Sequence, residues 1–161
     1  MAIDRVREYL KTWNMDEKIL EFCTSSATVD LAAQALGCEG ARIAKTLSFQ
    51  TEDGCFLVVA AGDAKIDNGK FKNRFHMKAK MLAPEMVETL TGHAVGGVCP
   101  FGIKAGIPVY LDISLKRFIT VYPACGSSNS AIELTLNELE DLSHYTEWVD
   151  VCKGWNELAE E

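Results

Sequence analysis

The sequence predicts a single α+β domain with a mixed, barrel-like β-sheet surrounded by helices. Short apolar runs of strand length outnumber the helical segments, and the helices fall between them irregularly, without a strand-helix-strand rhythm. The chain has 161 residues, the usual length of one domain, so residues 1–161 are expected to form one unit. Its apolar content of 48% is sufficient for a core without disulfides or metal.

Helix signals come from apolar periodicity and from capping residues. Residues 3–13 have apolar side chains at helical spacing with charges between them. Thr28 has the position of an N-cap, and Pro84 has that of a first helical residue in a segment closed by Gly92. These signals predict helices over 3–13, 28–36, 67–75, 84–91 and 135–142, the last capped by Thr135.

Strand signals come from short apolar runs bounded by turn residues. They predict strands over 18–23, 43–49, 55–61, 78–82, 107–111, 118–122, 131–134 and 146–151. Asp53-Gly54 separates two of these runs and is a hairpin signal. The strands over 43–49 and 55–61 are therefore expected to be antiparallel neighbours.

A lysine interrupts the apolar face of the strand over 43–49. Alternation along the strand places Lys45 on the same face as Ile43, Leu47 and Phe49. An ammonium among large apolar side chains must either extend to an edge, where water solvates it, or reach a cavity that holds an anion. Lys45 is therefore the strongest single candidate for a binding residue, and a solvated edge lysine is the alternative.

The segment from His93 to Gly102 contains three glycines and one proline in ten residues. Glycine permits positive φ and close backbone approach, and proline stiffens the segment, so backbone N–H groups can be held in fixed directions. An ordinary tight connection is the alternative. The Gly-x-x-x-x-Gly-Lys-Ser/Thr spacing of nucleotide triphosphatases is missing from the sequence, so that activity is not expected.

The six cysteines are spread through the chain with no Cys-x-x-Cys pair, which is typical of separate reduced thiols. The three histidines are equally scattered, and we expect no metal and no cofactor. Cys99 is a candidate nucleophile because it lies in the glycine-rich segment, six residues after His93. A small buried thiol is the more ordinary explanation.

The net charge of −7 argues against tight, sequence-independent binding of nucleic acid, and we expect no DNA partner. From Asp63 to Lys80, however, six basic residues face two acidic ones, a local charge of +4. Such a band can contact a few phosphates of a folded RNA, although a solvated helix face explains it equally well. Acidic residues dominate 133–161, and about 152–161 should form an acidic tail.

The N-terminus has mixed charge and lacks the apolar stretch of a signal peptide. No segment approaches the roughly 18 apolar residues that are needed to span a bilayer. The sequence therefore predicts a cytoplasmic protein without a membrane partner.

Four motifs together resemble the YbaK-like family, the free-standing relatives of the editing domain that is inserted in bacterial prolyl-tRNA synthetases. They occur in the family's order and cover about residues 18–142. The Lys-Thr strand combined with Gly-Gly-x-x-Pro is the specific part of the match. The motifs are Thr28-Val-Asp-Leu-Ala-Ala-x-x-Leu-Gly37, Ile43-Ala-Lys-Thr-Leu47, Thr91-Gly-His-Ala-Val-Gly-Gly-Val-Cys-Pro-Phe-Gly102 and Ile132-Glu-Leu134.

The resemblance implies a barrel-like mixed sheet and hydrolysis of the ester between a wrongly attached amino acid and the 3′-terminal ribose of a tRNA. Lys45 would hold the phosphate and ribose of the terminal adenosine, and the backbone of Gly96 and Gly97 would polarise the ester carbonyl. The chemistry needs positioning and electrostatic stabilisation but no protein nucleophile. The implied substrate-binding residues are Phe22, Thr28, Thr46, Val98, Cys99, Pro100, Phe101, Gly102, Ala124 and Gly126.

The implied partners are aminoacyl-tRNA, in particular tRNA(Pro) carrying Cys, Ala or another small amino acid, and prolyl-tRNA synthetase as a candidate. One turn departs from the family: Ala124 replaces a serine, and Ser128-Asn129 replaces Arg-Gly. Because this turn borders the amino-acid pocket in relatives, it leaves open which amino acid is removed. Two alternatives to the deacylase remain, a Cys99-dependent thiol hydrolase and a non-catalytic module that binds tRNA or a synthetase.

Overall fold

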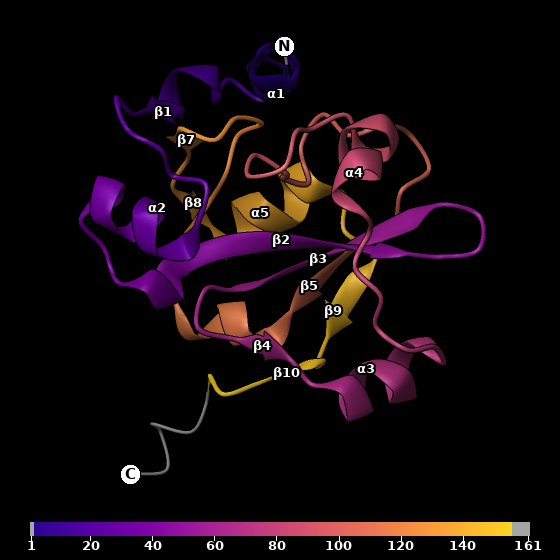
Figure 1. Cartoon of the computed structure of the whole chain (residues 1–161). Coiled ribbons are helices and arrows are strands. Elements are labelled where there is room, and N and C mark those ends of the chain that lie inside the picture. The colour runs from indigo at the N-terminus through magenta and orange to yellow at the C-terminus, as the bar shows by residue number, and fades with distance from the viewer. Residues whose placement is uncertain (1, 156–161) are drawn as a thin grey trace, which may run out of the picture.

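The computed structural model describes residues 2–155 and has a strongly curled, six-stranded mixed sheet at its centre (Figure 1). The strand order is β8-β6-β2-β3-β5-β9. The six strands are β2 (Ile43–Gln50), β3 (Cys55–Ala61), β5 (Val109–Asp112), β6 (Thr120–Pro123), β8 (Leu134–Thr135) and β9 (Glu147–Val149). The predicted α+β class and mixed, barrel-like sheet are confirmed.

The hairpin of β2 and β3 forms the middle of the sheet. The two strands are antiparallel, as the Asp53-Gly54 signal predicts, and Lys45 lies opposite Ala60. The pairs β2·β6, β3·β5 and β5·β9 are parallel, and β6·β8 is antiparallel. Every residue of β3 is buried, so the site described below is built around a rigid centre.

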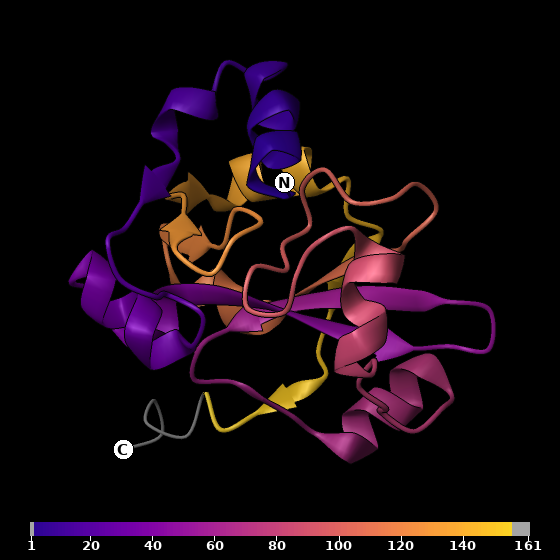
Figure 2. The same ribbon diagram turned by 45° about the horizontal axis from the view of Figure 1, so that its top comes forward.

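Helices cover both sides of the curled sheet. In Figure 1, α1, α4 and α5 lie above β2, α3 lies below it, and α2 lies beside its first residues; Figure 2 shows the same arrangement from above. The α-helices are α1 (Ala2–Lys11), α2 (Val29–Leu36), α3 (Asn68–Phe75), α4 (Pro84–Thr91) and α5 (Leu136–Ser143). Three short 3-10 helices are η1 (Asp16–Lys18), η2 (Gly40–Arg42) and η3 (Ile113–Arg117).

The capping residues act as the sequence predicts. The Thr28 hydroxyl accepts a hydrogen bond from the Leu31 N–H at 3.2 Å, and Thr135 forms a capping box with Glu138. Helix α4 begins at Pro84 and ends at Gly92, which has φ of +91°. The helix boundaries are therefore fixed locally by the residues that predict them.

Two predicted strands differ from the structure. The strand over 78–82 reduces to one isolated bridge between Met81 and Phe49, because α4 begins shortly afterwards. The strand over 131–134 is two strands, since β7 (Ser130–Ala131) pairs with β1 (Leu20–Glu21) whereas β8 pairs with β6. A second two-stranded pair joins β4 (Lys65–Ile66) and β10 (Cys152–Lys153). Of the predicted acidic tail, residues 156–161 lie outside the described residues.

An aromatic cluster fills the space between the sheet and α3. Phe49 and Phe56 from the hairpin pack against Phe71 and Phe75 of the helix, with ring centroids 4.7–5.9 Å apart. This packing holds α3, with its basic residues, against the end of the hairpin. No helix in the described part of the chain is long and apolar enough to cross a membrane.

Candidate functional site

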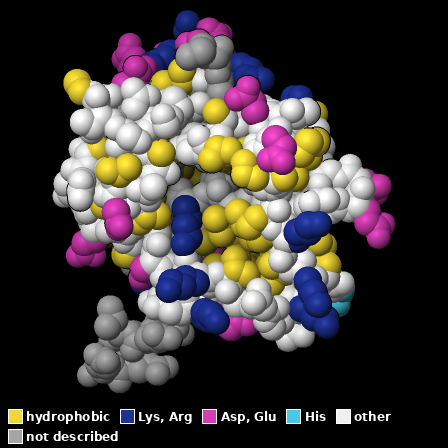
Figure 3. All heavy atoms as spheres, in the orientation of Figure 1, with side chains coloured by type: hydrophobic (Ala, Val, Ile, Leu, Met, Phe, Trp, Pro, Cys, Tyr) yellow, Lys and Arg dark blue, Asp and Glu magenta, His cyan; other side chains and the backbone are white. Residues whose placement is uncertain are grey.

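A cleft of about 440 Å³ opens along one edge of β2. Every residue from Ile43 to Ser48 lines it. Tyr122 and Ala124 form part of one wall, and Met81 and Pro84 form part of the opposite one. In Figure 3 the hollow contains hydrophobic side chains, with Lys and Arg side chains gathered around its lower rim. Its size is that of an ordinary small-molecule site.

The structure brings only part of the predicted site together at this cleft. Six of the predicted residues line it: Thr28, Lys45, Thr46, Gly96, Val98 and Ala124. The other predicted residues lie outside the lining, buried in the interior or, for two of them, half-buried elsewhere. These are Gly97, Cys99, Pro100, Phe101 and Gly126 in the interior, and Phe22 and Gly102 half-buried.

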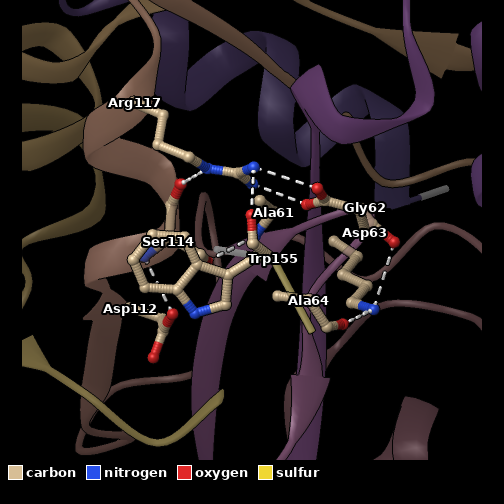
Figure 4. Close-up of polar contacts among 9 residues, drawn as sticks. Ala61, Gly62, Asp63, Ala64, Asp112, Ser114, Arg117 and Trp155 are labelled. Atoms are coloured by element: carbon tan, nitrogen blue, oxygen red, sulfur yellow. Dashed lines mark hydrogen bonds and ion pairs between the residues drawn. The ribbon is translucent and has the colours of Figure 1, made fainter. Parts of the chain in front are cut away.

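The Lys45 side chain is half-buried and donates hydrogen bonds to two backbone carbonyls, those of Gly62, at 3.4 Å, and Ala64 (Figure 4). An ammonium has three N–H donors, so one remains for a ligand. Burial lowers the pKa of Lys45 and the nearby Lys65 lowers it further, while Cys152 and Asp63 oppose the shift. Within the described residues, no carboxylate lies at ion-pair distance from Lys45.

The carboxylate nearest in sequence to these carbonyls is engaged elsewhere. Arg117 binds Asp63 through two hydrogen bonds of 2.5 and 2.9 Å, and it also donates to the backbone carbonyl of Trp155 at 2.9 Å (Figure 4). This bidentate pair holds the turn after β3 in place. Lys45 is therefore left without a carboxylate partner among the described residues.

The turn that receives Lys45 is fixed sterically as well. A Cβ at Gly62 would lie 2.0 Å from the carbonyl oxygen of Gly40, so only glycine fits there. On the preceding residue, the Ala61 N–H donates to the Ser114 hydroxyl at 3.1 Å. The buried Asp112 then accepts from the N–H groups of Ser114 and Val151 at 2.9 and 3.0 Å. Lys45 is therefore directed by a preorganised pair of carbonyls.

The two neighbouring glycines of the 93–102 segment differ. The Gly97 N–H donates to the Ala94 carbonyl at 3.0 Å, and the Gly97 carbonyl accepts from Gly126 N–H at 3.0 Å. A Cβ on Gly97 would lie 2.6 Å from the Ser127 nitrogen. Gly96 lines the cleft with φ of +90°, and its N–H has no acceptor among the described residues. The donor that this segment can offer a ligand is thus Gly96.

Cys99 does not have the surroundings of a nucleophile. It is fully buried, and burial raises the pKa of its thiol to about 12. Its sulfur lies 3.6 Å from His93 Nε2, but that nitrogen is 2.7 Å from the Phe101 carbonyl, to which it can only donate. Since Cys99 also lies outside the cleft lining, the geometry does not support it as a catalytic thiol.

Sequence reasoning missed Tyr122, which forms part of the cleft wall. Its hydroxyl donates to Glu133 at 3.1 Å, and the Arg42 guanidinium lies 4.9 Å from its ring centroid. Hydrogen bonds from Thr120 and Tyr122, with the charge of Arg42, lower the pKa of Glu133. Glu133 belongs to the Ile-Glu-Leu motif. This motif was the one sequence signal that could have indicated Tyr122, its hydrogen-bond partner, as a residue of the cleft wall.

The turn that departs from the family pattern packs directly against the cleft. Ser128 accepts from the Ser26 N–H at 2.6 Å, and a Cβ on Gly96 would lie 3.6 Å from the Ser128 Cβ. Asn129 and Phe22 exchange hydrogen bonds of 2.8 and 3.1 Å. The backbone of Phe22 therefore stabilises the 124–129 turn, although Phe22 itself does not line the cleft.

Some of the basic residues in the 63–80 band have no acidic partner among the described residues. Lys70 and Arg74 on α3 pair with Asp150 and Glu147 at 3.1 and 2.5 Å. Lys72, Lys78 and Lys80 have no carboxylate at ion-pair distance in the described part of the chain. Across the same residues, no group of His, Cys, Asp and Glu side chains is arranged to hold a metal ion.

The family model of the aminoacyl-tRNA editing domain matches residues 23–142. The chain belongs to the aminoacyl-tRNA editing domain family. The match contains β2, α4, the glycine-rich segment and the 124–129 turn, so it covers every wall of the cleft. The expected relationship to YbaK-like proteins is confirmed.

Among curated proteins, the Bacillus subtilis protein YwhH is 55% identical over 156 residues, which are 96% of this chain and 99% of YwhH. EbsC of Enterococcus faecalis, a proposed Cys-tRNA(Pro)/Cys-tRNA(Cys) deacylase, is 27% identical over 86% of this chain and 80% of its own length. Among solved structures, a proposed trans-editing enzyme for prolyl tRNA synthetase has a TM-score of 0.84 and 33% identity. That match covers 95% of this chain and 98% of the other.

Proposed function

We propose that this chain is a trans-editing deacylase. Its substrate would be a mischarged tRNA, in particular tRNA(Pro), that carries cysteine, alanine or another small amino acid on the 3′-terminal ribose. Membership of the editing family and the similarity to EbsC and to the solved trans-editing protein support this reaction class. The chain, residues 1–161, would act as one editing domain.

One observation carries the proposal: Lys45 is a half-buried cation in the cleft without a carboxylate partner among the described residues. A charge in such a place is stabilised when an anion joins it. The terminal phosphate of a tRNA is an anion attached directly to the nucleoside that carries the amino acid. We therefore assign Lys45 as an anchor for this phosphate, not as a base.

The reaction then requires only water and a polarised carbonyl. Water attacks the ester carbon and the bond to the ribose oxygen breaks. That oxygen takes one proton of the water, the amino acid leaves as a carboxylate, and the second proton passes to solvent. The Gly96 N–H would donate to the carbonyl oxygen, on which negative charge develops. Gly97, whose N–H is already engaged, would instead hold the segment in position. Cys99 takes no part.

The walls of the cleft are apolar and carry many short side chains. Five alanines line the cleft: Ala27, Ala32, Ala44, Ala124 and Ala131. Shallow apolar walls of this kind separate side chains that differ by one methylene by only ~1 to 3 kcal/mol. The chain should therefore accept several small side chains. Because Ala124 lies where relatives have a serine, it is the residue to change first when specificity is tested.

The basic rim would contact the rest of the acceptor end of the tRNA. Lys72, Lys78 and Lys80 have no described acidic partner, and in Figure 3 basic side chains follow the lower rim of the hollow. A few such contacts suit a short stretch of RNA backbone and give a binding constant that depends on salt. The acidic remainder of the protein would repel nucleic acid elsewhere.

A deacylation panel tests the proposal. The purified chain is incubated with tRNA(Pro) charged with cysteine, alanine, serine or proline, and the remaining ester is measured with time. We expect hydrolysis of the small, wrongly attached amino acids and sparing of prolyl-tRNA. If the protein hydrolyses none of these esters, the proposal is wrong. Tight binding of the same tRNAs without cleavage would favour the non-catalytic module.

A further inference from the structure

The outer edge of β2 has two different partners and a gap between them. At its start, β2 pairs with β6, with Ala44 opposite Pro123. Towards its end, the Leu82 N–H donates to the Ser48 carbonyl at 2.9 Å, and the Gln50 N–H donates to the Lys80 carbonyl at 2.8 Å. The cleft occupies the interval between Ala44 and Ser48.

Both partners leave β2 where the gap begins. On one side the pairing of β6 with β2 ends at Pro123, and the next residue, Ala124, bridges Ala131 on the opposite edge of β6. On the other side, the next donor in the ladder after Leu82 would be residue 84. That residue is Pro84, which has no N–H and starts α4.

The peptide groups of Thr46 lie in this gap. Ser48 and Gln50 direct their backbone groups to the outer edge, and the two-residue period of a strand directs those of Thr46 to the same edge. The inner edge of β2 is occupied by β3. Among the hydrogen bonds of the described residues, none engages the Thr46 N–H or C=O at the outer edge. At Thr46 the strand edge thus offers the cleft one free donor and one free acceptor.

An aminoacyl ester carries an ammonium next to its carbonyl, and the cleft must satisfy both. None of the residues that line the described cleft is an aspartate or a glutamate. An acceptor for the ammonium must therefore be a hydroxyl or a backbone carbonyl. Paired residues of an antiparallel sheet exchange two hydrogen bonds, N–H to C=O in both directions. The aminoacyl group has the same two functions at nearly the same spacing.

We propose that the aminoacyl group pairs with Thr46 as if it were one residue of an added β-strand. Its ammonium donates to the Thr46 carbonyl, and its ester carbonyl accepts from the Thr46 N–H, which assists Gly96 as the negative charge develops. This inference rests on the proposed deacylase function. The protein would then recognise the amino and carbonyl groups of the substrate through the peptide groups of Thr46, whichever small side chain is attached.

The first arm of the test changes the substrate. Wild-type protein is given tRNA(Pro) esterified with alanine or with propionate, which lacks the amino group, and each rate is divided by the uncatalysed rate of the same ester. We expect the normalised kcat/KM to fall roughly tenfold to hundredfold for propionate, the usual range for loss of a charged hydrogen bond. Equal normalised rates would overturn the inference.

The second arm changes the backbone. An α-hydroxy analogue of threonine at position 46 replaces the N–H by oxygen, and the same replacement at Gln50 is the matched control. Gln50 lies on the same edge outside the cleft, and its N–H is already bonded to Lys80. We expect roughly tenfold loss of kcat at position 46 only. Equal kcat for the two variants, at matched thermal stability, would contradict the role of the Thr46 N–H.

The third arm does not need turnover. The amide signal of Thr46 is followed by NMR and hydrogen exchange in the wild-type chain while 3′-deoxy-3′-(alanylamino)adenosine, an uncleavable analogue, is added. We expect protection of Thr46 on binding, and an unprotected amide in the saturated complex would overturn the inference. If alanyl-tRNA itself stays intact in the first arm, the deacylase function fails, and this measurement still decides the pairing.

Discussion

The two segments that carry the family motifs use their residues in opposite ways. The Ile43–Leu47 strand presents every residue to the cleft, whereas the 93–102 segment presents Val95, Gly96 and Val98 and buries most of the rest in the interior. The difference follows from position: the strand has a free edge, and the loop is packed between the 124–129 turn and α1. Gly102, for example, approaches the backbone of Arg5.

A motif residue can therefore be required for two different physical reasons. Packing does not require a charged side chain at Lys45, so the presence of this lysine indicates a ligand. Gly97 has a complete packing explanation, since any Cβ would strike the backbone of Ser127 and Gly126. Substitutions of the buried loop residues, such as Gly97, should act first on stability, and substitutions on the strand should act first on catalysis.

The largest effect on stability is expected at Gly97. Gly97→Ala places a Cβ 2.6 Å from the Ser127 nitrogen, so the free energy of unfolding should fall by about 2 kcal/mol or more. Gly54→Ala is the control, because no atom lies within 4 Å of its added Cβ. Urea denaturation of both variants decides the matter, and equal stability would show that the loop can shift without cost.

The second effect concerns the charge of Lys45. Burial lowers its pKa, so its charge is lost at a lower pH than for an exposed lysine. Affinity for the uncleavable alanylamino analogue with a 5′-phosphate should then fall about tenfold as the pH rises through this pKa. Lys45→Arg should bind equally over the same range, since arginine stays charged up to about pH 12. If both proteins lose affinity equally at high pH, Lys45 is not the residue that binds the phosphate.

The third comparison uses two caps of the same type. Thr28→Ala and Thr135→Ala should each cost about 1 kcal/mol of stability, because each removes an N-cap. Only Thr28 lines the cleft, so only its variant should also lower kcat/KM. If the two variants lose the same activity, or neither loses any, Thr28 acts as a cap alone.

The smallest catalytic effect is expected at Cys99. Cys99→Ala should leave kcat/KM unchanged, because the thiol is buried outside the cleft and its pKa of about 12 keeps it protonated. In the native protein, iodoacetamide should react with the exposed Cys23 before it reaches Cys99. If a folded Cys99→Ala protein no longer cleaves the ester, the hypothesis of a Cys99-dependent thiol hydrolase is supported instead.

Local signals in the sequence were sufficient for much of the fold. The Asp53-Gly54 hairpin, the caps at Thr28 and Thr135 and the first helical residue Pro84 all depend on neighbours in the chain, and the structure confirms each. The mixed character of the sheet also follows from the irregular order of its elements. Lys45 could be singled out because one charge interrupts an apolar pattern.

The features missed from the sequence depend on distant pairings. The gap at Thr46 lies where two segments that are far apart in the chain leave the outer edge of β2: β6 ends at Pro123, and α4 begins at Pro84. Likewise, the sequence could not separate Gly96 from Gly97, because their difference comes from contact with the 124–129 turn. Tyr122 joins the site only through the parallel pairing of β6 with β2.

The most direct test of the central claim, that Lys45 anchors the terminal phosphate in a deacylating cleft, is single-turnover hydrolysis of alanyl-tRNA(Pro) by wild type and Lys45→Ala. Lys70→Ala is the control, because Lys70 lies on α3 and is already paired with Asp150. We predict that Lys45→Ala loses at least roughly tenfold in kcat/KM, as expected for a charged hydrogen bond, while Lys70→Ala stays close to wild type. Full activity of Lys45→Ala would contradict the account.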